Sequence, residues 1–107
     1  MKNRRKALAV AVAAAAALST AFATPAQAAR GSFVYYVEGW WHGFELPDPA
    51  DGHCYNTQGV ANRPTNHTDR TAILYRGPDC HDSETVAFYQ PGTDGVEHFG
   101  SVKFVNW

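Results

Sequence analysis

The chain contains only two cysteines, and the second of them ends its most strongly patterned stretch. This stretch, NHTDRTAILYRGPDC, runs from Asn66 to Cys80. Its first residues, Asn66 to Asp69, have side chains typical of turns, and Thr71 to Tyr75 alternate as in a short strand. A disulfide between Cys54 and Cys80 leaves no cysteine over and is the expected pairing in an oxidising compartment. It would stabilise the fold by about 3.5 kcal/mol on the chain-entropy model, a large share of a small domain's stability.

The N-terminal region predicts a secretory signal peptide. Its start is basic, an apolar run extends from Ala7 to Leu18, and Ala26-Gln27-Ala28 supplies small residues at a cleavage site. A helix that spans a membrane needs roughly 20 apolar residues, and this run is shorter, which disfavours the alternative of an anchoring helix. We therefore predict a signal peptide over residues 1–28 and one small β domain over residues 29–107, secreted to the extracellular space.

Removal of the leader makes the protein acidic. Four of the nine basic residues lie in residues 1–28, so residues 29–107 hold five basic residues against ten acidic ones, a formal charge of −5. A surface of this sign is repelled by phosphate backbones and by anionic lipids. The sequence thus predicts no binding to nucleic acid and none to membranes after leader removal, and we expect a monomer.

Short β patterns follow one another through residues 29–107, with no sustained helical period. Residues 32–38 and 40–46 predict a hairpin around Gly39, and in its second strand Trp40 lies on the face of His42, Phe44 and Leu46. Further strands are predicted at residues 53–56, 71–75, 85–89 and 101–107, a loop at 47–52 and a polar connection at 59–64. The pattern indicates an all-β fold, a small antiparallel sandwich or barrel in which a Greek key is one possible strand order, with one disulfide.

The second half of the chain resembles a known family. The order Ala72-x-Leu74-Tyr75, Cys80, Phe88-x-x-Pro91-Gly92 and Ser101-Val102-Lys103-Phe104 resembles one Greek-key motif of the βγ-crystallin superfamily, over Thr71 to Phe104. Extracellular bacterial members of that superfamily include calcium-binding modules, and similar small secreted folds occur among protease inhibitors and killer-toxin-like proteins. The leader and the short acidic domain also look like small secreted proteins of high-GC Gram-positive bacteria that carry no assigned activity.

The calcium pattern of that superfamily is not matched at the corresponding position. It places two Asn or Asp residues shortly before a pair of serines, whereas here Glu97 and His98 lie before a lone Ser101. His53-Cys54 and Cys80-His81 would form a ligand set suited to zinc, but the disulfide uses the same thiolates. We therefore predict no metal site and no cofactor.

Four aromatic residues are the candidate ligand-contacting residues: Trp40, Trp41, Tyr36 and Trp107. Exposed aromatic rings can stack on sugars or anchor a protein partner. The alternative is that most of them belong to the core and to cross-strand pairs of a small sheet. Because the other face of residues 40–46 is mixed, we expect at least one of the two adjacent tryptophans near the surface.

No catalytic residues are predicted, because no nucleophile motif surrounds the candidate serines, Ser32, Ser83 and Ser101. The sequence favours a secreted, non-enzymatic binding or structural module whose partner is an unknown extracellular protein or glycan. It is also compatible with an inhibitor of an extracellular protease, because the Thr57 to Thr65 loop would be preorganised by the disulfide. A calcium- or carbohydrate-binding module and a small secreted hydrolase are two more functions that a domain of this size and composition could have.

Overall fold

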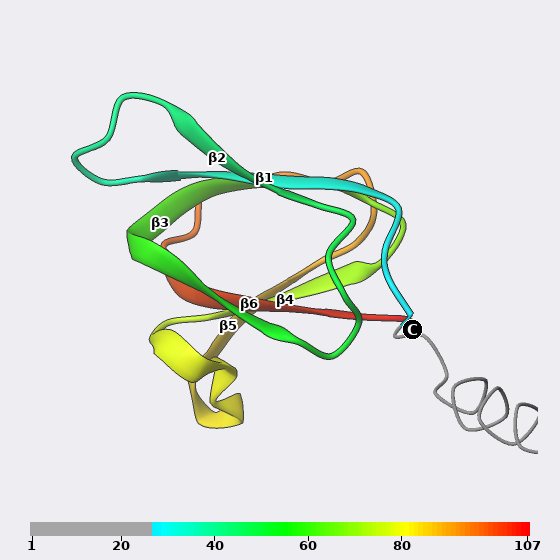
Figure 1. Cartoon of the computed structure of the whole chain (residues 1–107). Coiled ribbons are helices and arrows are strands. Elements are labelled where there is room, and N and C mark those ends of the chain that lie inside the picture. The colour runs from blue at the N-terminus through cyan, green and yellow to red at the C-terminus, as the bar shows by residue number, and fades with distance from the viewer. Residues whose placement is uncertain (1–26) are drawn as a thin grey trace, which may run out of the picture.

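The computed structural model describes residues 27–107, and these residues contain strands and two short 3-10 helices but no α-helix. The predicted all-β class is therefore confirmed. No helix of this part of the chain is long and apolar enough to cross a membrane. The predicted leader lies outside the described residues, apart from Gln27 and Ala28. The elements, shown in Figure 1, are β1 (Gly31–Val37), β2 (Gly43–Pro47), β3 (Cys54–Thr68), β4 (Thr71–Tyr75), η1 (Pro78–Cys80), η2 (Asp82–Glu84), β5 (Thr85–Tyr89) and β6 (Phe99–Val105).

All six strands belong to one antiparallel sheet with the order β2-β1-β3-β6-β4-β5. The long strand β3 pairs with β6 through its N-terminal part and with β1 through its C-terminal part. Figure 1 shows the resulting two layers, with β1 and β2 in one, β4, β5 and β6 in the other, and β3 passing between them. In a simple Greek key three consecutive strands pair in sequence order, and the fourth strand lies beside the first, at the edge of the group. Here β6 lies between β3 and β4 instead. The relationship to the βγ-crystallins stays a prediction.

The core lies between the two layers and is largely aromatic. From Phe33 onward every second residue of β1 is buried, as expected for a strand with one face inward. The ring centroids of Phe33 and Phe104 are 5.4 Å apart and those of Phe33 and Phe99 are 6.1 Å apart. Both pairs meet edge to face, an arrangement that aromatic rings favour. The buried core residues are Phe33, Tyr35, Val37, Ala61, Ala72, Leu74, Tyr89, Phe99, Val102 and Phe104.

Three predicted elements are confirmed. β4 and β5 have the bounds predicted for residues 71–75 and 85–89, and β1 and β2 form the predicted hairpin. Val102 and Phe104 point inward as predicted, although β6 begins at Phe99 and ends at Val105. All five residues of β4 are buried instead of alternating, because Ile73 and Tyr75 pack on the outer face beside Cys80.

The predicted polar connection at residues 59–64 and the predicted inhibitor loop from Thr57 to Thr65 are wrong, because these residues belong to β3. Gly59 lies where the pairing of β3 with β6 changes register, so the strand continues past it. Pro64 is buried, and its carbonyl oxygen accepts from the backbone N–H of Gly95 at 3.0 Å. A proline is tolerated in a strand where no ladder donor is needed. Pairing with distant strands therefore decides the conformation of this polar segment.

Asn66 was expected in a turn, but it is buried in β3 and links three segments. Its Nδ2 donates to the carbonyl oxygens of Arg70 and Tyr89, both at 2.8 Å. Its Oδ1 accepts from the backbone N–H and the hydroxyl of Thr68, at 3.1 Å and 2.6 Å. The turn comes three residues later, at Asp69 and Arg70. The Asn66 amide thus satisfies backbone groups that the turn leaves without ladder partners.

The predicted disulfide is confirmed, because Cys54 is bonded to Cys80 with a Cα–Cα distance of 5.9 Å. Beside it, Asn56 Nδ2 donates to Asp79 Oδ1 at 3.1 Å, and the Asp79 backbone N–H donates to Asn56 Oδ1 at 2.8 Å. The φ angles of Asp79 and Cys80 are 70° and 52°, in the left-handed region that L-residues rarely adopt. The disulfide and this pair of hydrogen bonds together hold η1 against β3.

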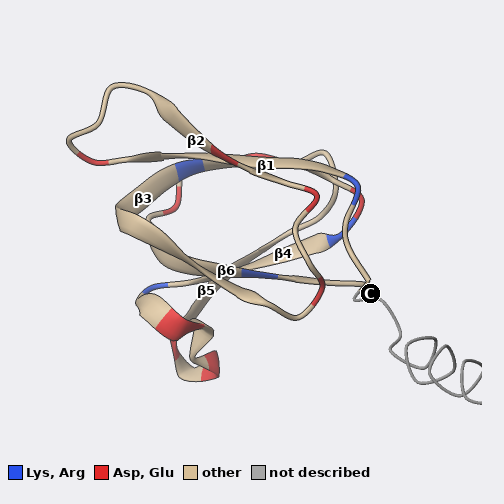
Figure 2. Ribbon diagram, viewed as in Figure 1, with Lys and Arg blue, Asp and Glu red and all other residues tan. Residues whose placement is uncertain are grey.

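Charged residues of both signs lie near the start of the described chain (Figure 2). Arg70 Nε lies 3.0 Å from Asp51 Oδ1, and both side chains are mostly buried. The backbone N–H groups of Arg30 and Gly31 donate to carboxylate oxygens of Asp69 and Asp48, at 2.8 Å and 2.9 Å. The start of β1 is therefore attached to the loop before β3 and to the turn after it.

The carboxyl group of Asp69 is expected to cause part of the loss of folding stability at low pH. The hydrogen bond from the Arg30 backbone N–H, and secondarily the charge of Arg70, hold the pKa of this carboxyl below its ordinary value of 3.8. A carboxyl with a lower pKa in the folded state stabilises that state above its unfolded pKa, and the stabilisation is lost as the pH falls through the folded pKa. We expect Asp69→Asn to be less stable than the wild type at pH 6, and this difference to shrink below about pH 4.

Urea unfolding at pH 6 and at pH 2.5 measures this difference. Asp82→Asn is the matched control, because Asp82 is exposed and its carboxylate has no hydrogen-bond partner among the described residues. A stability gap between wild type and Asp69→Asn that is the same at both pH values would refute the role given to Asp69.

Candidate binding surface at the β1–β2 turn

The turn between β1 and β2 places two tryptophans outside the sheet. Gly39 has a φ of 87°, a conformation that favours glycine, and the Trp40 backbone N–H donates to the Val37 carbonyl oxygen at 3.0 Å. The strand predicted at residues 40–46 begins only at Gly43, so the expectation that Trp40 belongs to it is wrong. The reason is that the chain needs residues 38–42 to reverse direction.

Four aromatic side chains meet at this turn, and we call them the aromatic tip: Trp40, Trp41, His42 and Phe44. The His42 ring lies 5.5 Å from Trp40 and 5.2 Å from Trp41, edge to face with both. Phe44 lies 5.5 Å from Trp40 and 5.1 Å from His42. The tip is therefore one connected group of rings, in which His42 separates the two indoles.

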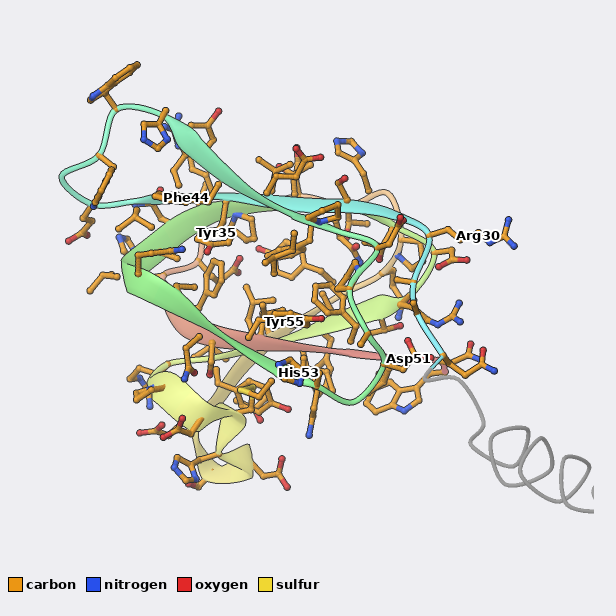
Figure 3. All side chains as sticks on the ribbon, in the orientation of Figure 1. Arg30, Tyr35, Phe44, Asp51, His53 and Tyr55 are labelled. Atoms are coloured by element: carbon orange, nitrogen blue, oxygen red, sulfur yellow. A yellow bond between two sulfur atoms is a disulfide. The ribbon has the colours of Figure 1, made fainter. Side chains whose placement is uncertain are left out.

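The aromatic tip rests on the core through Tyr35. The rings of Tyr35 and Phe44 are stacked at 5.6 Å, and Tyr35 meets Phe99 edge to face at 5.8 Å. Figure 3 shows the Tyr35 and Phe44 side chains close together beneath the hairpin. The Tyr35 hydroxyl donates to Gln58 Oε1 at 2.7 Å, and burial raises the pKa of this phenol above its ordinary value. This ring stack supports the tip from below.

The two indoles themselves are open to solvent. Trp41 is 91% exposed and Trp40 is 51% exposed. Residues 39–44 contain no Lys, Arg, Asp or Glu, and the hairpin carries one acidic residue on either side of them, Glu38 and Glu45 (Figure 2). The nearest ion pair joins Glu38 Oε2 and His98 Nε2 at 3.3 Å, at the base of the turn. The geometry thus provides a protruding aromatic surface with hydrogen-bonding groups beside it.

The other two candidate aromatic residues lie elsewhere. Tyr36 points to the opposite face of β1 from Tyr35, and the Arg63 guanidinium carbon lies 4.3 Å from its ring centroid. Trp107 follows β6, is 77% exposed and packs against Phe88 of β5 at 5.6 Å. The structure therefore brings Trp40 and Trp41 together and separates both from Trp107. His42 and Phe44 were not predicted as site residues, although their alternation with Trp40 signalled a shared face.

The two cysteines considered for metal binding, and Ser101 among the three serines considered for catalysis, have structural partners. The two thiolates of the zinc interpretation are joined in the disulfide. Ser101 is buried; its Oγ accepts from the Cys80 backbone N–H at 3.0 Å and donates to the Gly77 carbonyl oxygen at 2.7 Å. Within residues 27–107, no three His, Cys, Asp or Glu side chains are grouped closely enough to hold a metal ion.

Comparison with known proteins adds no relative, since no family model, curated protein or solved structure matches the chain.

Proposed function

We propose that the protein is a secreted, non-catalytic binding module that uses the aromatic tip to bind neutral polysaccharide. The observation that carries this proposal is the 91% exposure of Trp41, next to a second partly exposed tryptophan in a turn supported by the core. Exposing an indole forgoes the apolar burial that normally stabilises a small domain, so an exposed pair marks a binding surface. Sugar rings present C–H groups that suit the negative face of an indole.

The size of the aromatic tip favours a sugar over a protein partner. Large aromatic side chains bury about 150–250 Å² each, so two indoles supply roughly 300–500 Å². A stable protein interface buries about 800 Å² on each partner. A few sugar units need much less, and their hydroxyl groups can bond to polar groups such as His42 and Glu38.

The charge of the domain favours a neutral polymer. Residues 29–107 carry a formal charge of −5, which repels polyanions such as nucleic acid and acidic polysaccharides. Residues 40–44, which form the tip, include no Lys or Arg that could offset this repulsion. Neutral chains of glucose or N-acetylglucosamine are therefore the first probes.

We expect Trp41→Ala to weaken binding to such a chain about tenfold, the equivalent of 1.4 kcal/mol, with the melting temperature almost unchanged. Trp40→Ala should weaken binding by a similar factor, with a larger loss of stability because its ring contacts Phe44. Sedimentation with cellulose and chitin, and calorimetry with their oligosaccharides, measure the affinity.

Trp107→Ala is the matched control, since it removes an exposed indole from another part of the molecule. It should bind these polysaccharides as the wild type does. Equal losses in Trp41→Ala and Trp107→Ala, or no binding of the wild type to any neutral polysaccharide, would contradict the proposal. Tight binding to dextran sulfate would contradict the preference for a neutral ligand.

A further inference from the structure

A second surface feature lies where β3 and β6 separate. Their pairing goes from Asn56 opposite Ser101 to Ala61 opposite Phe99, so Thr57 to Val60 face Gly100 alone. The extra residues of β3 leave a groove with a volume of about 300 Å³, at the small end of the range for ligand sites. Its lining includes Thr57, Val60, Arg76, Pro78 and Phe99.

Three glycines form part of the lining of this groove. Gly59, Gly77 and Gly100 line it and place no side chain in it. At Gly100 the absence of a side chain is required, because a Cβ there would lie 2.8 Å from the Arg76 carbonyl oxygen. Phe99 is buried and packs against Phe33 and Tyr35, so the groove has a firm aromatic base.

Arg76 is the charged residue of the groove. Its side chain forms no ion pair, hydrogen bond or ring contact with any residue from 27 to 107. Three other cations have side-chain partners: Arg70 pairs with Asp51, Arg63 lies over the Tyr36 ring and Lys103 lies over the Tyr75 ring. Arg30, like Arg76, has none among residues 27–107, but it lies at the start of β1, away from the groove. The chain has ten acidic residues, and none of them forms an ion pair with Arg76 within residues 27–107. The Arg76 guanidinium is therefore free to bind an external anion.

We propose that the groove binds a small monocarboxylate with a short aliphatic tail. Arg76 would take the carboxylate, because the planar guanidinium matches the two oxygens of that group. The tail would lie against Val60, Pro78 and Phe99. The charge of −5 on residues 29–107 disfavours ligands with several negative charges, such as phosphates. This site is separate from the aromatic tip, and its proposal does not depend on polysaccharide binding.

Titration of the full secreted chain with octanoate, followed by backbone amide NMR, tests this site. We expect a dissociation constant below about 1 mM, with the largest shifts at Gly59, Val60, Gly77 and Gly100. Arg76→Gln should weaken binding at least tenfold, and octan-1-ol, with the same tail and no charge, should bind at least tenfold more weakly than octanoate. Arg30→Gln, an exposed arginine at the start of β1, is the matched control and should bind as the wild type does.

A second variant, at an apolar lining residue of the groove, also tests whether Arg76 binds the carboxylate. Val60→Glu places a carboxylate at a half-exposed lining position, where it would compete for Arg76, and should also abolish octanoate binding. Trp41→Ala should leave octanoate binding unchanged. Octanol binding as tightly as octanoate, full binding by Arg76→Gln, or shifts centred on the aromatic tip would each overturn the proposal.

Discussion

Reducing the Cys54–Cys80 bond is expected to lower the free energy of unfolding by about 3.5 kcal/mol, the largest single loss that we predict for this protein. The bond closes a segment with a sequence separation of 26, and its removal returns that conformational freedom to the unfolded chain. It also removes the tie that holds Asp79 and Cys80 at positive φ. A loss of this size corresponds to a fall in melting temperature of roughly 15–25 °C for a domain of this length.

Thermal unfolding with and without a phosphine reductant, and of the double variant Cys54→Ala/Cys80→Ala, measures this loss. The intact mass of the native protein should be lower than that of the reduced protein by two hydrogen atoms. Asn56→Ala is a useful comparison, because it removes the hydrogen bonds to Asp79 while leaving the disulfide in place, and should cost much less. A melting temperature that does not respond to reductant, with two titratable thiols before treatment, would show that the bond is absent from the native protein.

Asn66→Ala is expected to destabilise the fold by about 3 kcal/mol, because it removes the amide donor from two carbonyl oxygens and the acceptor of the Thr68 backbone N–H. One of the two oxygens keeps a longer contact from the Thr68 hydroxyl, at 3.2 Å. Those oxygens belong to Arg70 and Tyr89, at the ends of two different segments, so the loss affects the β3–β4 turn and β5 together. Asn66→Asp should be at least as damaging at neutral pH, since a buried carboxylate cannot donate these bonds and loses hydration.

Chemical denaturation of the two variants beside His67→Ala tests the role of Asn66. His67 is the next residue of β3 but is exposed, so its replacement should change stability by less than about 0.5 kcal/mol. Because a protonated carboxyl can donate one hydrogen bond, Asn66→Asp should recover part of its stability relative to Asn66→Ala as the pH falls. Equal stability of Asn66→Ala and His67→Ala would mean that the buried amide contributes little.

Local patterns predicted the elements whose structure depends mainly on neighbouring residues. Thr71 to Tyr75 and Thr85 to Tyr89 are short β-branched and aromatic runs bounded by turn residues, and both form strands with the predicted bounds. The disulfide followed from having only two cysteines in a chain with a predicted leader. At least one of the two adjacent tryptophans was expected near the surface from the mixed face of residues 40–46, and both are exposed.

The predictions from sequence were wrong in β3 and in the turn between β1 and β2. In these segments, contacts with residues distant in the chain decide the backbone conformation. Residues 57–65 are polar and include Gly59 and Pro64, which is typical of a loop. They form a strand because Ala61, Asn62 and Thr65 pair with β1, and Ala61 also pairs with Phe99 of β6. Asn66 has the side chain of a turn residue, but the fold buries its amide against carbonyl oxygens up to 23 residues away. Such pairings leave no periodic signal in the segment itself.

The sequence by itself determined the fold class, the covalent bond and the apolar strands, because these depend on composition and on the two-residue period of a half-buried strand. The tertiary structure alone decided which aromatic rings gather and where a groove opens. Trp40 and Trp41 form a surface with His42 and Phe44 because Tyr35 and Phe99 support them from the core. Arg76 joins Val60 and Phe99 only because β3 and β6 change register between Asn56 and Ala61. The groove combines residues that are distant in the chain, and the aromatic tip, although local in the chain, rests through Tyr35 on the distant Phe99. Both positions depend on strand pairing, which no local pattern encodes.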